Sequence, residues 1–276
     1  MQRIYSLAYL TSAPMAPPDA LVLAQKLGYQ AIGVRIAPAA PGGDFSPLVE
    51  DPAMLRDTVA RIRDTGVPVF DVEIVRLNEN FRADQFKRFL ETAGKLGARA
   101  ILVAGDDPDE GRLTASYAAF CDAAAPFNLT ADLEFMPWTA VRDAKSALRI
   151  ITNADRSNGR VLVDSLHAGR STTTLTDLAA IPGSRLSYAQ LCDAPREIPT
   201  THEGLIHTAR CARLLPGEGG IDLLGIVRQL PDTLPLSLEI PNEEQLPKLG
   251  AEEWGRRALA AAKRIVAKAY SQGVAR

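Results

Sequence analysis

The chain has 276 residues, of which 46% are hydrophobic and 23% charged, and its formal net charge is −2. This length and apolar content support one large core, and a charge this balanced carries no basic surplus for binding nucleic acid. Three scattered cysteines fit a reducing compartment, and no apolar run approaches the roughly 18 residues of a membrane span, so we expect a cytoplasmic protein with no nucleic-acid or membrane partner.

Short apolar runs alternate with longer amphipathic stretches along the chain. Eight runs are predicted to be strands: 4–10, 31–36, 68–77, 100–105, 130–136, 160–165, 186–191 and 234–240. Helical patterns cover 17–28, 51–66 and 83–97, and each ends at or next to a glycine, a common signal for a helix C-terminus. A last helix is predicted over 250–273, and segment 192–221 is predicted to be a long irregular loop.

The number and type of these elements favour a closed barrel. Eight strand–helix units in a chain of this length are typical of a (β/α)8 TIM barrel, and continuous apolar runs are typical of parallel strands covered on both faces. No linker or shift in composition divides the chain, so residues 1–276 are predicted to form a single domain. The alternative is a doubly wound open sheet, but it usually has fewer strands, and no GxGxxG motif follows the first strand.

Four consecutive predicted strands end in or near a residue with a side-chain oxygen. These are Glu134 in LEFMPW, Asp164 in LVDSLH, Gln190 in AQLCDAP and Glu239 in SLEIPN. In a barrel the C-terminal ends of the strands meet at one mouth, where the active site lies. Three carboxylates there would repel each other, and a bound divalent cation would remove the repulsion. Oxygen ligands favour Mn²⁺ or Mg²⁺, with Co²⁺ and Zn²⁺ as alternatives.

The order Glu, then Asp-x-x-His, then Gln, then Glu resembles the xylose isomerase-like TIM-barrel superfamily, the sugar phosphate isomerase/epimerase and family 2 AP endonuclease type. The motifs LEFMPW, LVDSLH, AQLCDAP, RLLPGEGGID and SLEIP carry this resemblance, which covers essentially the whole chain. The resemblance implies one divalent metal ion held by Glu134, Asp164, Gln190 and Glu239. Many relatives have His where this chain has Gln190. It also implies a small polyhydroxy ketone as substrate, and many relatives are homo-oligomers.

The resemblance further implies a metal-dependent isomerase or epimerase of a small keto-sugar or hydroxy-ketone. Glu134 and Glu239 would act as acid and base on the two faces of an enediolate stabilised by the metal. His167, three residues after Asp164, would contact a substrate oxygen or assist proton transfer. The candidates for substrate binding are Arg213, Arg210, Trp138 and Arg76.

The alternative interpretation is a metal-dependent lyase of the 3-dehydroshikimate dehydratase type. If a hydroxyl lies β to the carbonyl, the same enolate can expel it, and Arg210 and Arg213 would then bind a substrate carboxylate. QLCDAP, the arginines before PGEGG, and SLEI resemble that branch as well, whereas VRLNEN at the end of the third predicted strand does not. An AP endonuclease would need many His ligands, and the chain has three His in total.

Overall fold

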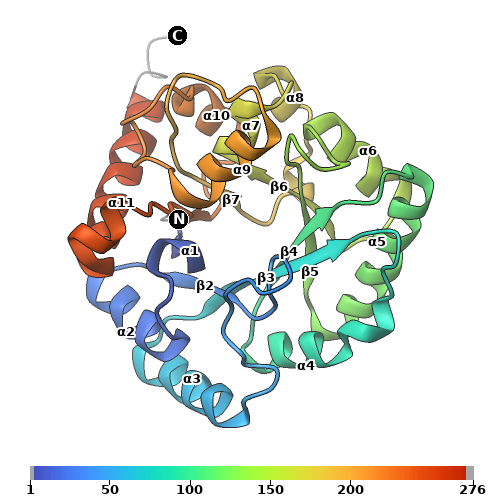
Figure 1. Cartoon of the computed structure of the whole chain (residues 1–276), viewed down its shortest axis with the longest axis horizontal. Coiled ribbons are helices and arrows are strands. Elements are labelled where there is room, and N and C mark those ends of the chain that lie inside the picture. Colours follow the sequence, from blue (N-terminus) through green and yellow to red (C-terminus); the bar gives the residue numbers. More distant parts are fainter. Residues whose placement is uncertain (1–2, 272–276) are drawn as a thin grey trace.

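Eight parallel strands form a closed barrel in which each strand pairs with the next and β8 pairs with β1 (Figure 1). The strands are β1 (Tyr5–Leu7), β2 (Ala31–Arg35), β3 (Val69–Leu77), β4 (Ala100–Gly105), β5 (Thr130–Glu134), β6 (Gly159–Asp164), β7 (Ala189–Gln190) and β8 (Leu236–Leu238). This computed structural model describes residues 3–271. It confirms the predicted TIM barrel, and each strand lies within or overlaps one of the eight predicted runs.

Helices surround the strands in Figure 1 and cover the outer, apolar face of the barrel. They are α1 (Tyr9–Ser12), α2 (Pro17–Leu27), α3 (Pro52–Thr65), α4 (Lys87–Lys95), α5 (Glu110–Ala124), α6 (Ala144–Ala154), α7 (Ser165–Arg170), α8 (Leu175–Ala179), α9 (His202–Cys211), α10 (Leu223–Gln229) and α11 (Gln245–Ser271). Short 3₁₀ turns lie at Ala83–Phe86, Ala125–Phe127 and Gly183–Arg185. Among the described residues, no helix is long and apolar enough to cross a membrane.

Local signals in the sequence explain where helices begin and end. The Asp51 side chain accepts hydrogen bonds from the backbone N–H groups of Ala53 and Met54 at the start of α3, and Gly66 ends the helix with a positive φ of 69°. A carboxylate satisfies otherwise unpaired N–H groups at a helix start, and glycine adopts this left-handed conformation at little cost. The predicted helices 17–28 and 51–66 therefore match α2 and α3 closely.

One prediction about the C-terminal part of the chain needs correction, and another is confirmed. Segment 192–221 is not a continuous loop, because it contains α9, whose start is capped by Thr201 accepting from the backbone N–H of Gly204. The last long helix begins at Gly250 as predicted, because that residue has a non-helical φ of 75° and ψ of 157° and separates it from a short helical piece that starts at Gln245. Predicted helical residues 272 and 273 lie outside the described residues.

The barrel interior contains a tier of polar residues directly below the mouth. Residues two apart in a strand point to the same side of it, so each residue of this tier lies beneath a polar residue nearer the mouth. The pairs, lower residue first, are Asp71 and Glu73, Asp132 and Glu134, Tyr188 and Gln190, and Ser237 and Glu239, and all eight residues are buried. The lower four each have a buried oxygen without a hydrogen-bond partner among the described residues.

Candidate active site

The four predicted ligand residues come together at the mouth of the barrel. Glu134, Asp164 and Gln190 are the last residues of β5, β6 and β7, and Glu239 follows β8 directly. Their exposed fractions are 3%, 0%, 2% and 4%, in that order. Burying three carboxylates side by side is unfavourable unless positive charge or a metal ion compensates for it.

The Gln190 amide lies between two of these carboxylates. Turned one way, its nitrogen donates to Asp164 Oδ2 at 3.1 Å and to Glu134 Oε1 at 2.9 Å. Turned the other way, its oxygen faces the same two carboxylates, and this arrangement is repulsive unless a cation lies among them. One amide and three carboxylate oxygens are the donors that Mn²⁺ and Mg²⁺ prefer, so these residues fit a divalent metal ion.

Arg213 supplies positive charge to the same cluster. Its NH1 group lies 2.6 Å from Asp164 Oδ2, its NH2 group lies 2.8 Å from Glu239 Oε2, and its Nε donates to the backbone oxygen of Ala209 at 2.7 Å. The side chain is only 3% exposed. Arg213 was predicted to bind substrate, but the structure engages both of its terminal nitrogens with carboxylates of the cluster, so its first role here is to hold Asp164 and Glu239.

One carboxylate anchors the segment that carries Arg213. Asp193 accepts hydrogen bonds from the backbone N–H groups of Gly217, Gly219 and Ile221 at 3.0, 3.0 and 3.1 Å. It also pairs with Leu214, the residue after Arg213, in an isolated antiparallel bridge. The PGEGG turn is therefore wrapped around the Asp193 side chain, which fixes where the arginine segment enters the barrel mouth.

Burial and like charges change the acidity of the two glutamates. Burial, reinforced by Asp164 and Glu239, raises the pKa of Glu134 well above its usual range. Burial also raises the pKa of Glu239 to about 7, although Arg213 acts in the opposite direction. Carboxyl groups that hold a proton near neutral pH are suited to act as general acids and bases, because they exchange protons at the pH of the cell.

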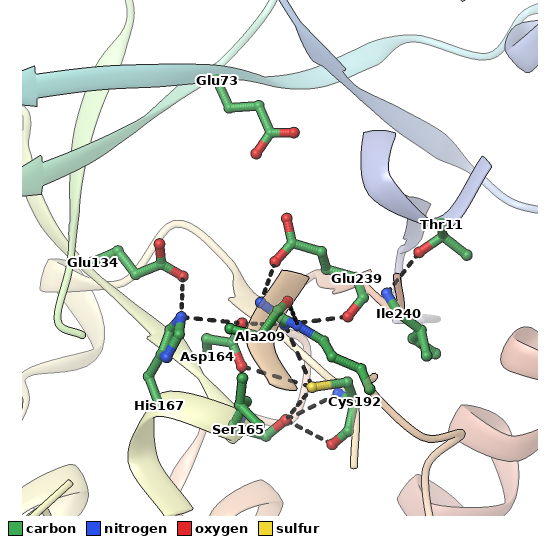
Figure 2. A network of polar contacts seen from close by, with 12 residues as sticks. Thr11, Glu73, Glu134, Asp164, Ser165, His167, Cys192, Ala209, Glu239 and Ile240 are labelled. Atoms are coloured by element: carbon green, nitrogen blue, oxygen red, sulfur yellow. Dashed lines mark hydrogen bonds and ion pairs between the residues drawn. The ribbon is translucent and has the colours of Figure 1, made fainter. Parts of the chain in front are cut away.

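His167 and Trp138 form one wall of the site. His167 Nε2 lies 3.6 Å from Glu134 Oε1 and 4.0 Å from Asp164 Oδ2, and Figure 2 shows the imidazole pointing toward both. Trp138 packs edge-on against the imidazole with ring centroids 5.0 Å apart. Burial lowers the pKa of His167 to about 4, with Asp164 opposing the change. The imidazole is therefore neutral at pH 7 and carries one N–H that it can donate.

Asp164 has a second, structural role. Its Oδ1 accepts a hydrogen bond from the backbone N–H of Leu166 at 2.6 Å and so caps the start of α7. Because α7 begins at once after β6, His167 is carried on its first turn. The Asp-x-x-His spacing in the sequence thus places a carboxylate and an imidazole on the same side of the pocket.

The opposite wall of the pocket contains residues that the sequence analysis did not predict. Glu73 lies across the site from Asp164 in Figure 2, and Arg35 NH2 lies 3.5 Å from Glu73 Oε1. Both residues line the pocket together with Glu134, Glu239 and His167. The available signal was a charged residue inside each of the apolar runs AIGVRI and VFDVEIVRL, which is unexpected in a fully buried strand.

Arg76 and Arg210, both predicted to bind substrate, also line this pocket, but they differ in their hydrogen bonds to the protein. Arg76 donates from Nε to the backbone oxygen of Ala39 at 2.7 Å and from NH1 to Asp106 Oδ2 at 2.6 Å. Arg210 makes no hydrogen bond or ion pair with any described residue. Burial lowers the pKa of Arg210, and Arg76 and Arg35 lower it further. Arg210 is therefore an exposed cation at the edge of the pocket, without a partner among the described residues.

A closed parallel barrel with buried carboxylates at its mouth defines the class of protein. A family model described as xylose isomerase-like TIM barrel matches residues 21–265, and the chain belongs to this family. This family assignment agrees with the resemblance carried by the strand-end motifs.

One curated relative and two solved structures describe its neighbours. The 3-dehydroshikimate dehydratase of Pseudomonas aeruginosa is 27% identical over 204 residues, which are 68% of this chain and 32% of the relative. The chain thus spans about a third of the length of that relative. An IolI protein crystallised with a zinc atom has a TM-score of 0.80 at 20% identity, with 97% of this chain and 99% of that chain covered.

The second structure is the D-allulose 3-epimerase of Methylomonas sp., with a TM-score of 0.69 at 14% identity and coverage of 96% of this chain and 98% of that chain. At these identities, the two structures establish a shared fold. The dehydratase and the epimerase are both enzymes, and a zinc atom is bound to the IolI protein.

Proposed function

We propose that the protein is a divalent-metal-dependent lyase that removes water from a small hydroxy-ketone bearing one carboxylate, as the name of its dehydratase relative indicates. The observation that carries this proposal is the unpaired Arg210 guanidinium at a pocket that also contains the acid–base carboxylates. Arg210 is exposed to solvent at the rim of the pocket, so its guanidinium is available to form a charge-assisted pair with a substrate carboxylate.

The charges around the pocket indicate a single negative charge on the substrate. Arg35 lies beside Glu73, and Arg76 is paired with Asp106. Arg213 is paired with two carboxylates of the ligand cluster. Arg210 alone is left without a partner among the described residues, so it is available to pair with one substrate carboxylate. A single available cation favours a substrate with one negative charge over a phosphorylated one.

The residues of the site can carry both proton transfers of such a dehydration. Glu134 or Glu239 takes the proton from the carbon next to the carbonyl, and the electron pair released there expels the hydroxyl on the β carbon. The other glutamate, protonated because its pKa is raised, donates a proton to the departing hydroxyl, which leaves as water, and neutral His167, close to Glu134, donates a hydrogen bond to a substrate oxygen. When bound by Glu134, Asp164, Gln190 and Glu239, a divalent ion would polarise the carbonyl and make the neighbouring proton more acidic.

A second candidate is an isomerase or epimerase of a small keto-sugar. The observation that favours it is that Glu134 and Glu239 both line the pocket, approach from different strands, and both have raised pKa values. Two such groups can remove a proton on one face of a carbon and return it on the other. The epimerase among the structural neighbours supports this alternative at the level of the fold.

One set of assays separates the two candidates. Protein loaded with Mn²⁺ is mixed with 3-dehydroshikimate, and the ultraviolet band of an aromatic product is followed. We expect metal-dependent aromatisation that is lost in Glu134→Gln. In parallel, unphosphorylated ketoses are incubated in D₂O and examined for deuterium incorporation and for a new epimer. Epimerisation without aromatisation by metal-loaded protein would overturn the lyase proposal and support the isomerase.

A further inference from the structure

A second group of metal-binding side chains lies apart from the carboxylate cluster. His207 and Cys211 are on α9, and Glu243 is in the segment between β8 and α11. One ligand atom from each of the three lies within 4.8 Å of the other two. His207 and Cys211 are four residues apart, so they occupy neighbouring positions on the same face of the helix.

The backbone holds the third residue against the end of α9. The N–H of Glu243 donates to the backbone oxygen of Cys211 at 2.8 Å. The neighbouring residues Ala212 and Asn242 form an isolated antiparallel bridge, and Asn242 Nδ2 donates to the backbone oxygen of Arg213 at 2.9 Å. Glu243 is therefore fixed next to the helix by main-chain contacts rather than by a chance approach of two flexible side chains.

The donor set differs from that of the active site. An imidazole nitrogen, a thiolate sulfur and a carboxylate oxygen together suit Zn²⁺, whereas the buried group of Glu134, Asp164 and His167 contains no sulfur and mainly oxygen donors. His207 and Glu243 side chains are 59% and 61% exposed, so a metal ion can reach them, and water can take a fourth position. Of the three cysteines, Cys211 is the one that is not buried.

We propose that His207, Cys211 and Glu243 form a second metal site that binds Zn²⁺. A bound ion would join the last turn of α9 to the segment that follows β8. Arg210 precedes Cys211 and lines the active-site pocket, and Glu239 lies four residues before Glu243. The ion would therefore fix both segments that carry these pocket residues, and its binding does not depend on which reaction the pocket catalyses.

Titration with Co²⁺ tests the site directly, because Co²⁺ replaces Zn²⁺ in such sites and a thiolate ligand produces a charge-transfer band in the near ultraviolet. We expect the band in the wild-type protein, its displacement by Zn²⁺, and its loss in Cys211→Ser. His207→Ala and Glu243→Gln should each weaken Co²⁺ binding by about tenfold or more, since even a lost outer-sphere partner typically costs that much. The band should survive in Glu134→Gln, which alters the buried cluster.

Matched controls lie on the same elements. His202→Ala removes an imidazole at the start of α9, and Glu244→Gln removes a carboxylate next to Glu243, and both should leave the Co²⁺ affinity unchanged. No band in the wild type would overturn the proposal. So would a band that persists in Cys211→Ser, because its source would be the buried Cys192 near Asp164. A band unaffected by both His207→Ala and Glu243→Gln would also exclude the three-residue site.

Discussion

Glu134 and Glu239 carry the same chemical group but have different neighbours. Glu239 is paired with Arg213, whereas Glu134 faces the amide of Gln190 and the imidazole of His167. General acid–base groups typically contribute about 10² to 10⁴ in rate. We expect Glu134→Gln and Glu239→Gln each to lower kcat by about this factor, measured with metal-saturated protein. Circular dichroism and thermal unfolding should show that both variants fold.

The Gln variants keep the size of the side chain and one oxygen, so the loss should reflect proton transfer in addition to any weaker metal binding. Measuring bound metal in each variant separates these two effects. A Glu239→Gln enzyme with full metal content and undiminished kcat would remove Glu239 from the acid–base assignment and leave Glu134 as the remaining proton carrier.

Arg210 tests the charge of the substrate. A hydrogen bond to a charged group contributes about 1.5–3 kcal/mol, which corresponds to about 10- to 150-fold in binding. We therefore expect Arg210→Ala to raise KM for a carboxylate substrate by about this factor while kcat changes little, because the guanidinium makes no contact with the acid–base residues among the described contacts. Steady-state kinetics on both proteins measure the effect, and Arg210→Lys should recover part of the affinity.

A neutral substrate provides the control for this prediction. The methyl ester of the same substrate lacks the negative charge, so wild-type protein should discriminate against it and Arg210→Ala should not. If the variant loses affinity for acid and ester equally, Arg210 has a structural role in α9, and the pocket does not select a carboxylate.

Most of the candidate site could be predicted because its residues follow apolar runs in a regular order. Glu134, Asp164, Gln190 and Glu239 each end a strand, and parallel barrel strands end at one mouth. Arg35 and Glu73 were missed because a charged residue in a mostly apolar run also fits a solvent-facing strand end, and the run of Glu73 holds two more charged residues, Asp71 and Arg76. The pairing of Arg213 with Asp164 and Glu239 joins residues 49 and 26 positions apart, which no local pattern reveals.

At the scale of elements, the turn around Asp193 sets the position of Arg213. The Asp193 carboxylate accepts from the backbone N–H groups of Ala194, Gly217, Gly219 and Ile221. Each buried N–H left without a partner costs about 1–3 kcal/mol. We expect Asp193→Ala to lower the free energy of unfolding, measured by urea denaturation, by at least about 2 kcal/mol. The upper limit is several times the cost of one unpaired N–H.

The same substitution should reduce activity although Asp193 does not line the pocket, because the arginine segment would lose its anchor. Asp222→Ala is a matched control. The Asp222 side chain accepts a hydrogen bond from the backbone N–H of Gly225 at the start of α10, but it makes no such bond to the PGEGG turn. Unchanged stability in Asp193→Ala would mean that the turn keeps its shape through its other contacts, chiefly the close packing of Gly219 on Ala194.

The element boundaries show what local patterns can predict. Runs 100–105 and 31–36 match β4 and β2 almost residue for residue, because β4 is apolar throughout and β2 is apolar up to its last residue, Arg35. Run 186–191 shrinks to the two residues of β7, since a strand ends where its ladder of hydrogen bonds ends and not where its apolar residues end. Helix α9 was missed because prolines and arginines before its Thr201 cap resemble a loop.

At the scale of the whole molecule, the barrel combines an apolar outer face with a polar interior near the mouth. Gly33 of β2 illustrates how closely the interior is filled, because a Cβ at that position would lie 2.8 Å from Asp71 Oδ2. Burial raises the pKa of Asp71 well above its usual range, and Glu73 and Glu239 raise it further. Burial also raises the pKa of Asp132 to about 7. The interior thus stores protons that the unfolded chain would release.

This storage makes stability depend on pH with a definite sign. Above the ordinary Asp pKa of about 3.9, the unfolded chain has lost the Asp71 proton while the folded barrel keeps it. The folded state therefore binds more protons, and the free energy of unfolding decreases as pH rises, by up to about 1.4 kcal/mol per pH unit for each such group. The contribution of protonated Asp71 to the free energy of unfolding is fully present below about pH 4. It is lost as pH rises through the pKa that Asp71 has in the folded barrel.

Asp71→Asn removes this dependence because an amide cannot ionise. Between pH 5 and 8, we expect the free energy of unfolding to decrease less steeply with rising pH in the variant than in the wild type. The stability of the variant relative to the wild type should therefore increase steadily over this range. Urea denaturation at several pH values, with metal chelated so that the ligand cluster is the same in both proteins, measures the two slopes. The difference between the two slopes reports Asp71 together with its coupling to Glu73, Glu239 and Asp132. Parallel slopes would mean that Asp71 is ionised in the folded barrel and that a cation, not a proton, balances it.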